Sequence, residues 1–136
     1  YPNPSRPPGP TRRRTLRSVD DSVGGVLLDE LERKRILNDT IVVFTSDHGY
    51  FYGQHGLSVE GRLAYEESIR IPLLMRYGRN FRPGTRRREI ALTVDLAPTL
   101  IEAALGTVET RMDGRSLLPL CRGERPAWRN SFLIEY

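Results

Sequence analysis

The sequence predicts an α/β fold, and three observations support this prediction. A helical pattern of apolar residues begins at Leu16 and is followed by an apolar, β-branched run at 41–45. A second apolar run, at 71–75, precedes another helical pattern at 96–105. Because helices and strands alternate along the chain in this order, we expect the helices to flank a sheet.

Length and composition indicate one globular domain. The chain has 136 residues, of which 38% are hydrophobic and 28% charged, enough for about one domain with its own core. No apolar run approaches the roughly 20 residues of a membrane span, and the first ten residues lack the apolar segment of a signal peptide. We therefore expect no membrane partner.

Positive charge is carried almost entirely by arginine. There are 21 Lys+Arg against 17 Asp+Glu, a net charge of +4, and Lys34 is the only lysine. Two arginine runs, Arg12–Arg14 and Arg86–Arg88, raise the alternative of a non-catalytic basic domain that binds acidic polymers. Aromatic residues do not alternate with these arginines, so nucleic acid is not an expected partner. Cys121 is the only cysteine, which excludes an internal disulfide and a cysteine-based zinc site.

The first element is a helix that follows an irregular start. Residues 1–14 are rich in proline and arginine and are predicted to be irregular. The apolar residues that then recur at steps of three and four are Leu16, Val19, Val23, Val26, Leu27 and Leu31. Gly24 and Gly25 weaken this helix by roughly 1 kcal/mol each relative to alanine, and a close approach to a neighbouring backbone would explain them.

The strand at 41–45 ends in the most informative residues of the chain. Ser46, Asp47, His48 and Gly49 follow it directly, and a glycine-rich loop at 49–61 comes next. Ligands of open α/β sheets bind at the carboxyl ends of strands. Asp47 and His48 there can offer an oxygen and a nitrogen to a divalent cation. The alternative is that Asp47 caps a turn and His48 is an ordinary polar residue.

Caps and short apolar runs predict the remaining elements. These are a short helix at 65–68, a strand at 71–75, a strand or extended segment at 90–94, a helix at 96–105, a turn and short apolar element at 113–120, and a strand at 131–136. Pro72 stands near the start of its strand, where a missing N–H is tolerated. We expect Asp95 to be the N-cap of helix 96–105 and Gly106 to end it.

Six blocks of sequence, taken in order, resemble the sulfatases of the alkaline phosphatase superfamily. The blocks are Asp20–Gly24, Asn38–Gly49, Gln54–Gly56, Ala64–Pro72, Val94–Leu100 and Asp113–Pro119. The resemblance implies that residues 15–136 are part of a sulfatase-like catalytic domain, with a partial α/β sheet incomplete at both ends. Sulfatases use a formylglycine nucleophile made in an upstream Cys/Ser-x-Pro-x-Arg motif. This chain lacks that motif, so we expect it to be inactive alone.

The resemblance also implies a chemistry. Asp47 and His48 match the family's later pair of metal ligands. The family metal is usually calcium, and the histidine leaves room for manganese or zinc. The expected substrate is a sulfate ester on a carbohydrate, and the expected location is periplasmic or extracellular. A phosphodiesterase or phosphonate ester hydrolase of the same superfamily is the alternative.

Other residues near the expected site are less decisive. Gly61 stands where the family has a basic residue that grips the sulfate, and Arg62 beside it is either the replacement or a solvated charge. His55 is either a catalytic acid–base or a structural hydrogen-bonding residue. Tyr50, Phe51 and Tyr52 either line a substrate pocket or pack the loop. Glu66 and Glu67 suit a helix start and are assigned no chemistry. We interpret the run from Cys121 to Arg125 as a surface turn, although it resembles the missing nucleophile motif.

A sheet without its neighbouring strands leaves open edges and an uncovered apolar face. We therefore expect either extensive pairing between copies of this chain or an unusual self-contained arrangement.

Overall fold

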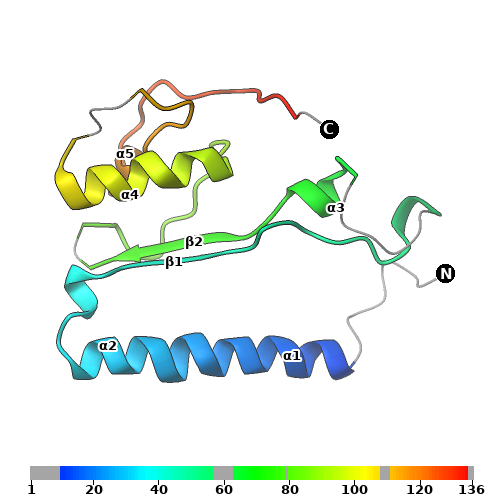
Figure 1. Cartoon of the computed structure of the whole chain (residues 1–136), viewed down its shortest axis with the longest axis horizontal. Coiled ribbons are helices and arrows are strands. Elements are labelled where there is room, and N and C mark those ends of the chain that lie inside the picture. The colour runs from blue at the N-terminus through cyan, green and yellow to red at the C-terminus, as the bar shows by residue number, and fades with distance from the viewer. Residues whose placement is uncertain (1–9, 57–62, 79, 108–110, 135–136) are drawn as a thin grey trace. The chain divides into compact units, whose positions relative to one another are not determined.

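The computed structural model describes residues 10–56, 63–78, 80–107 and 111–134 (Figure 1). The described residues form two compact units, of which the first ends at Tyr77 and the second begins at Gly78. No helix among the described residues is long and apolar enough to span a membrane.

One long helical element opens the first unit. It consists of α1 (Pro10–Asp20), a π-helical stretch η1 (Asp21–Leu28) and α2 (Asp29–Arg33), which run on from one another in Figure 1. It begins at Pro10, within the segment that the sequence predicts to be irregular. From Thr15 to Arg33 no residue of the element is buried. Leu16 is 62% exposed and Val26 68% exposed, whereas Val23 and Leu31 are half-buried, so the apolar stripe is only partly covered among the described residues.

The explanation expected for the two helix glycines is wrong. A Cβ atom added at Gly24 or at Gly25 would meet nothing within 4 Å. No described backbone approaches them closely, and the structure gives no packing reason for either glycine.

The sheet of the first unit has two antiparallel strands, β1 (Ile41–Thr45) and β2 (Leu73–Tyr77). Thr45 pairs with Leu73 and Ile41 with Tyr77. The first strand is confirmed as predicted, whereas the second begins two residues later than expected because Pro72 has no N–H to donate to a partner strand. The 3₁₀ turn η2 (Leu37–Asp39) precedes β1. The 3₁₀ turn η3 (Gln54–Gly56) and helix α3 (Glu66–Ile69) follow β1 and precede β2 in the sequence.

The second unit is built on two helices. The 3₁₀ turn η4 (Thr93–Asp95) leads into α4 (Leu96–Leu105), and α5 (Leu118–Arg122) follows later in the chain. The predicted end of α4 is confirmed, since Gly106 takes a left-handed φ of 80°. The buried apolar residues of the second unit are Phe81, Leu117, Leu118 and Leu120.

Two predictions for this unit need revision. Residues 90–92 are not a strand and lead into η4, which decides between the two alternatives for 90–94. The strand predicted at 131–136 is wrong for residues 131–134, which have no regular structure; residues 135–136 lie outside the described part of the chain. Apolar alternation needs a neighbouring strand to become a sheet, and the described residues of the second unit contain none.

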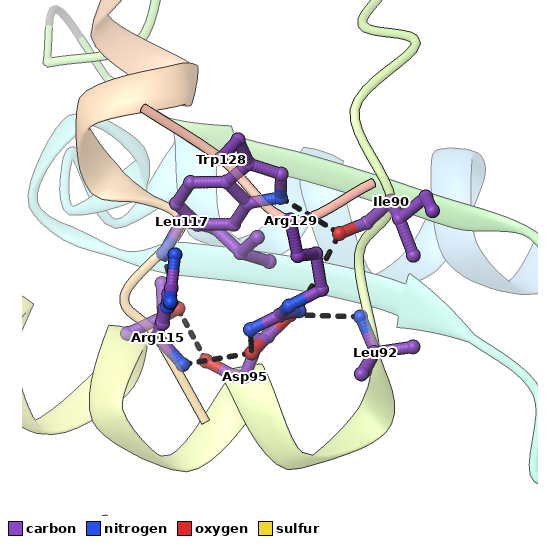
Figure 2. A network of polar contacts seen from close by, with 8 residues as sticks. Ile90, Leu92, Asp95, Arg115, Leu117, Trp128 and Arg129 are labelled. Atoms are coloured by element: carbon purple, nitrogen blue, oxygen red, sulfur yellow. Dashed lines mark hydrogen bonds and ion pairs between the residues drawn. The ribbon is translucent and has the colours of Figure 1, made fainter. Parts of the chain in front are cut away.

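A buried carboxylate holds the second unit together (Figure 2). Asp95 is fully buried. One of its oxygens accepts the N–H of Leu92 at 2.8 Å, and the other accepts the N–H of Arg115 at 2.8 Å. The guanidinium of Arg129 binds both oxygens, with Nη2 2.8 Å from Oδ1 and Nη1 on Oδ2. The carboxylate therefore joins the start of α4 to two later segments.

This network corrects the expected role of Asp95. Its side chain makes no capping hydrogen bond to α4 and instead closes the preceding turn through Leu92. Burial alone would raise the pKa of Asp95, but the hydrogen bonds from Arg129, Arg115 and Leu92 outweigh burial and hold that pKa below its ordinary value. Asp95 is therefore ionised and fully paired at neutral pH.

Candidate functional site

Asp47 and His48 lie together at the carboxyl end of β1. Both side chains are accessible, since that of Asp47 is 85% exposed and that of His48 is 55% exposed. Asp47 Oδ2 and His48 Nε2 are 3.6 Å apart. One cation can touch both atoms, because its bonds to such ligands are about 2.0–2.6 Å long.

Local hydrogen bonds fix the Asp47 carboxylate. Its Oδ1 accepts the N–H of His48 at 2.9 Å and lies 3.3 Å from the hydroxyl of Ser46. The pKa of Asp47 is lowered, first by the hydrogen bond from the His48 backbone and then by the nearby His48 charge. The other oxygen, Oδ2, is the one that faces the imidazole, so an ionised oxygen is presented to a ligand.

The His48 ring has one nitrogen occupied and one nitrogen available. Nδ1 is 2.7 Å from the carbonyl oxygen of Gly49. A carbonyl can only accept a hydrogen bond, so the proton of the neutral ring belongs on Nδ1 and the lone pair on Nε2. Histidines that bind metals typically donate their other ring N–H in this way. The donor set therefore fits a divalent cation.

The pair alone would be only part of a metal site. Among the described residues, no group of three or more His, Cys, Asp and Glu side chains is placed to hold a metal ion. Divalent cations take at least four ligands. A cation held by this pair would therefore need further ligands.

Gly49 anchors the loop that follows the pair. Its N–H donates to the carbonyl of Ser68 at 2.6 Å. A Cβ at this position would collide with the carbonyl oxygen of Glu67, so only glycine permits the approach. Phe51, two residues further on, is fully buried. The loop is thereby fixed to α3 directly after Asp47 and His48.

His55 is bound to Glu67, a pairing that sequence reasoning missed. Its Nε2 is 3.0 and 3.1 Å from the two carboxylate oxygens of Glu67. The ring stacks on Tyr65 with centroids 4.8 Å apart and meets the ring of Phe51 edge-on at 6.2 Å. Twelve residues separate the two partners without a periodic pattern, so the sequence contains no signal of the contact.

The structure places the other expected site residues as follows. Tyr50 and Tyr52 meet edge to face, with ring centroids 5.2 Å apart, and are 42% and 38% exposed. Gly61 and Arg62 lie outside the described residues. Among the described residues, no hydrogen bond, ion pair or ring contact joins His55 to Asp47 or His48, so Asp47–His48 and His55–Glu67 are two pairs, and Gly49 lies between them.

Arg87, in the second arginine run, and Cys121 are both held within the folded second unit. Arg87 donates to the carbonyl oxygens of Leu120 at 2.9 Å and Glu124 at 3.3 Å, which ties it to the end of α5. Burial raises the pKa of Cys121, so this thiol is protonated at neutral pH. Neither environment suits polymer binding by Arg87 or nucleophilic chemistry by Cys121.

Comparison with known proteins gives one consistent result. The family described as "N-sulphoglucosamine sulphohydrolase, C-terminal" matches residues 53–136. N-acetylglucosamine-6-sulfatase of Capra hircus is 41% identical over 127 residues, which are 92% of this chain and 22% of that protein. An extracellular sulfatase SULF-1 homolog of Drosophila melanogaster is 42% identical over 128 residues, 91% of this chain and 11% of that protein.

Two solved structures match the fold. The protein BT4656, in complex with its substrate D-glucosamine-2-N,6-O-disulfate, is 39% identical, with a TM-score of 0.75 over 85% of this chain and 24% of its own. A phosphonate monoester hydrolase from Silicibacter pomeroyi is 30% identical, with a TM-score of 0.73 over 93% of this chain and 26% of its own. The chain thus spans about a quarter or less of the length of these proteins.

Proposed function

This chain belongs to the sulfatase family, and from that premise we propose that it contributes two metal ligands, Asp47 and His48, to the active site of a sulfate ester hydrolase. The expected fold class is confirmed, since the chain folds as a segment of an alkaline-phosphatase-like sulfatase with helices and a two-stranded sheet. The observation that carries the proposal is the orientation of the pair, with Asp47 Oδ2 lying 3.6 Å from His48 Nε2 while His48 Nδ1 contacts the Gly49 carbonyl.

The chemistry of sulfate ester cleavage explains why such a pair is needed. Negative charge builds up as the ester breaks, and a bound divalent cation supplies the opposite charge and orients the sulfate oxygens. Asp47 and His48 would hold that cation, each fixed by hydrogen bonds to its own backbone neighbours. The nucleophile and the remaining ligands would belong to parts of the intact protein outside this sequence, so the chain alone is expected to be inactive.

We propose calcium as the resident cation, as the family resemblance suggests. Manganese and zinc are the alternatives, because an imidazole nitrogen suits them better than it suits calcium. Metal analysis of the intact protein as purified distinguishes the three ions.

We propose a sulfated amino sugar as the substrate. Two relatives carry names or ligands of that kind, a sulfatase of N-acetylglucosamine and a complex with a disulfated glucosamine. The exposed Tyr50 and Tyr52 follow the ligand pair closely in sequence and offer apolar faces of the kind that stack on sugar rings. Arg62 remains our proposal for the sulfate contact. We propose an extracellular or periplasmic location, which is supported by a relative named as an extracellular sulfatase.

Substitution of the ligand pair in the intact protein tests the function. Asp47→Asn removes a charge at nearly constant shape, and His48→Ala removes the nitrogen ligand. We expect both variants to lose bound metal, measured by plasma mass spectrometry, and at least about a hundredfold in kcat/KM on an aryl sulfate. Glu66→Gln, an exposed carboxylate on α3, is the control. Full metal content and activity in both variants would reject the proposal.

A second candidate reaction is the hydrolysis of phosphonate monoesters. It is favoured by the similarity to the phosphonate monoester hydrolase and by Gly61, which stands where sulfatases have a basic residue. Comparison of kcat/KM for an aryl sulfate and an aryl phosphonate monoester decides between them, and a higher value for the phosphonate would replace our first choice.

A further inference from the structure

The His55–Glu67 pair is a well-formed side-chain contact to which the proposed function assigns no role. Both carboxylate oxygens of Glu67 lie within hydrogen-bonding distance of His55 Nε2, and the imidazole rests on Tyr65. The Glu67 side chain is 29% exposed, whereas that of its neighbour Glu66 is 74% exposed. Glu67 is therefore partly shielded from water, whereas the His55 side chain is 46% exposed.

The backbone next to Glu67 is linked to His48 through one residue, Gly49. The Gly49 N–H donates to the carbonyl of Ser68 at 2.6 Å, and the Gly49 carbonyl accepts the Nδ1–H of His48 at 2.7 Å. Gly49 is thus held by the residue after Glu67 on its N–H side and itself holds the His48 ring on its carbonyl side. Movement of residues 67–68 would therefore turn the His48 imidazole.

Helix α3 cannot fix that backbone by itself. It is four residues long, has no side-chain N-cap and is far below the length at which a helix is stable alone. Its local ion pair, Arg70 with Glu66 at 3.4 Å, is highly exposed and contributes little. Tertiary contacts must hold the helix, and the His55–Glu67 pair is a polar side-chain contact between α3 and the loop, in addition to the backbone hydrogen bond from Gly49 to Ser68.

We propose that His55 and Glu67 are positioning residues, which hold α3 against the loop so that Gly49 keeps His48 Nε2 directed at the cation. This inference rests on the proposed function, because it assigns the pair a role toward the same metal site. It also gives His55 a role other than acid–base catalysis, since the ring nitrogen that contacts Glu67 is committed to that contact.

The experiment uses the full 136-residue chain, with Mn²⁺ as the probe, and two NMR measurements. Hydrogen exchange of the Gly49 amide reports the contact with Ser68, and broadening of the His48 signals during a Mn²⁺ titration reports metal binding. Glu67→Ala removes the partner of His55. Glu67→Gln keeps an oxygen that accepts the Nε2–H, and Glu66→Ala is the matched control on the same helix.

We expect Glu67→Ala to lose about fivefold in Gly49 protection, as for one hydrogen bond, and to require roughly three- to tenfold more Mn²⁺ for half-maximal broadening. Glu67→Gln and Glu66→Ala should stay close to the parent chain. Unchanged Gly49 protection and unchanged Mn²⁺ response in Glu67→Ala would overturn the inference. If Glu67→Ala does not fold, Glu67→Asp, which is one methylene too short to reach His55, carries the same comparison.

Failure of the proposed function gives a different result. Broadening of His48 that is the same in Asp47→Asn as in the parent chain would reject the metal site. Loss of Gly49 protection in Glu67→Ala would still support a positioning role toward the His48 ring in that case, because hydrogen exchange is measured without metal.

Discussion

At the scale of single residues, the geometry of the candidate site depends on a few closely constrained backbone and side-chain atoms. The ring orientation of His48 follows from a carbonyl oxygen on the next residue, and the loop after it follows from the lack of a side chain at Gly49. Neither feature involves a large buried area. Small substitutions here should therefore have effects out of proportion to their size.

Gly49→Ala is one such substitution. The new Cβ would collide with the carbonyl oxygen of Glu67, and a backbone group cannot move aside as the end of a flexible side chain can. We expect the free energy of unfolding to fall by about 1–3 kcal/mol, measured by urea denaturation followed by circular dichroism. Gly25→Ala, where an added Cβ meets nothing within 4 Å, is the control and should not destabilise the chain.

Arg129→Met tests the buried network of the second unit. The substitution keeps much of the side-chain volume but leaves the fully buried Asp95 carboxylate without its charged partner. We expect a loss of about 3–5 kcal/mol in the free energy of unfolding of that unit, as for other buried ion pairs that lose one member. A loss below about 1 kcal/mol would mean that Arg129 adds little to the two backbone donors.

Asp95 also predicts how stability depends on pH. Its pKa in the folded chain lies below the ordinary value, because the bonds from Arg129, Arg115 and Leu92 outweigh the opposing effect of burial. A lowered folded-state pKa gives stability that is present above the unfolded-state value of about 3.9 and is lost as pH falls through the folded-state pKa. Urea unfolding between about pH 2 and pH 7 should show this acid loss, and Asp95→Asn should be less stable at neutral pH with a smaller loss in acid.

At the scale of elements, Gly24 and Gly25 weaken a helix, and no close packing contact compensates for this. Each has open space around it, and glycine costs up to about 1 kcal/mol relative to alanine inside a helix. We expect Gly24→Ala and Gly25→Ala each to raise helical circular dichroism and the free energy of unfolding by about 0.5–1 kcal/mol. Destabilisation by either substitution would show that the π-helical stretch needs a glycine backbone.

The elements that could be predicted from sequence are those fixed by their own residues. Strand β1 is a continuous run of β-branched and aromatic residues, and α4 has a left-handed glycine at its end. The segment at 131–134 has the right apolar residues but no strand beside it. Its structure therefore depends on contacts that a local pattern does not contain.

The candidate site divides in the same way. Asp47 and His48 are adjacent in sequence and follow a recognisable strand, so their pattern is enough to propose a ligand pair. Glu67 meets His55 only because the intervening loop folds back, and Asp95 is buried only because Arg129 reaches it from 34 residues away. Helix-start preferences account for an acidic residue at Glu67, but they gave Asp95 the wrong role and indicated the partner of neither residue.

At the scale of the whole molecule, much apolar surface is exposed. Leu16, Leu74, Leu105 and Leu133 are 62%, 60%, 75% and 81% exposed, and the described sheet has only two strands. Exposed apolar faces and open strand edges favour association. We expect analytical ultracentrifugation to show an average mass that rises with concentration between about 10 and 300 µM and falls again in mild urea. A constant monomer mass across that range would contradict this prediction.

The register of the two strands has an evolutionary consequence. Thr45, the last residue of β1, pairs with Leu73, the first residue of β2. The segment between them therefore begins and ends at the same residue pair of the sheet. The ligand pair, the aromatic residues and the His55–Glu67 contact all belong to the excursion between those two residues. Such an excursion can be lengthened, shortened or exchanged while the rungs on either side keep their pairing. Natural variation in the length or composition of this segment can therefore accumulate without disturbing the two strands from which it projects.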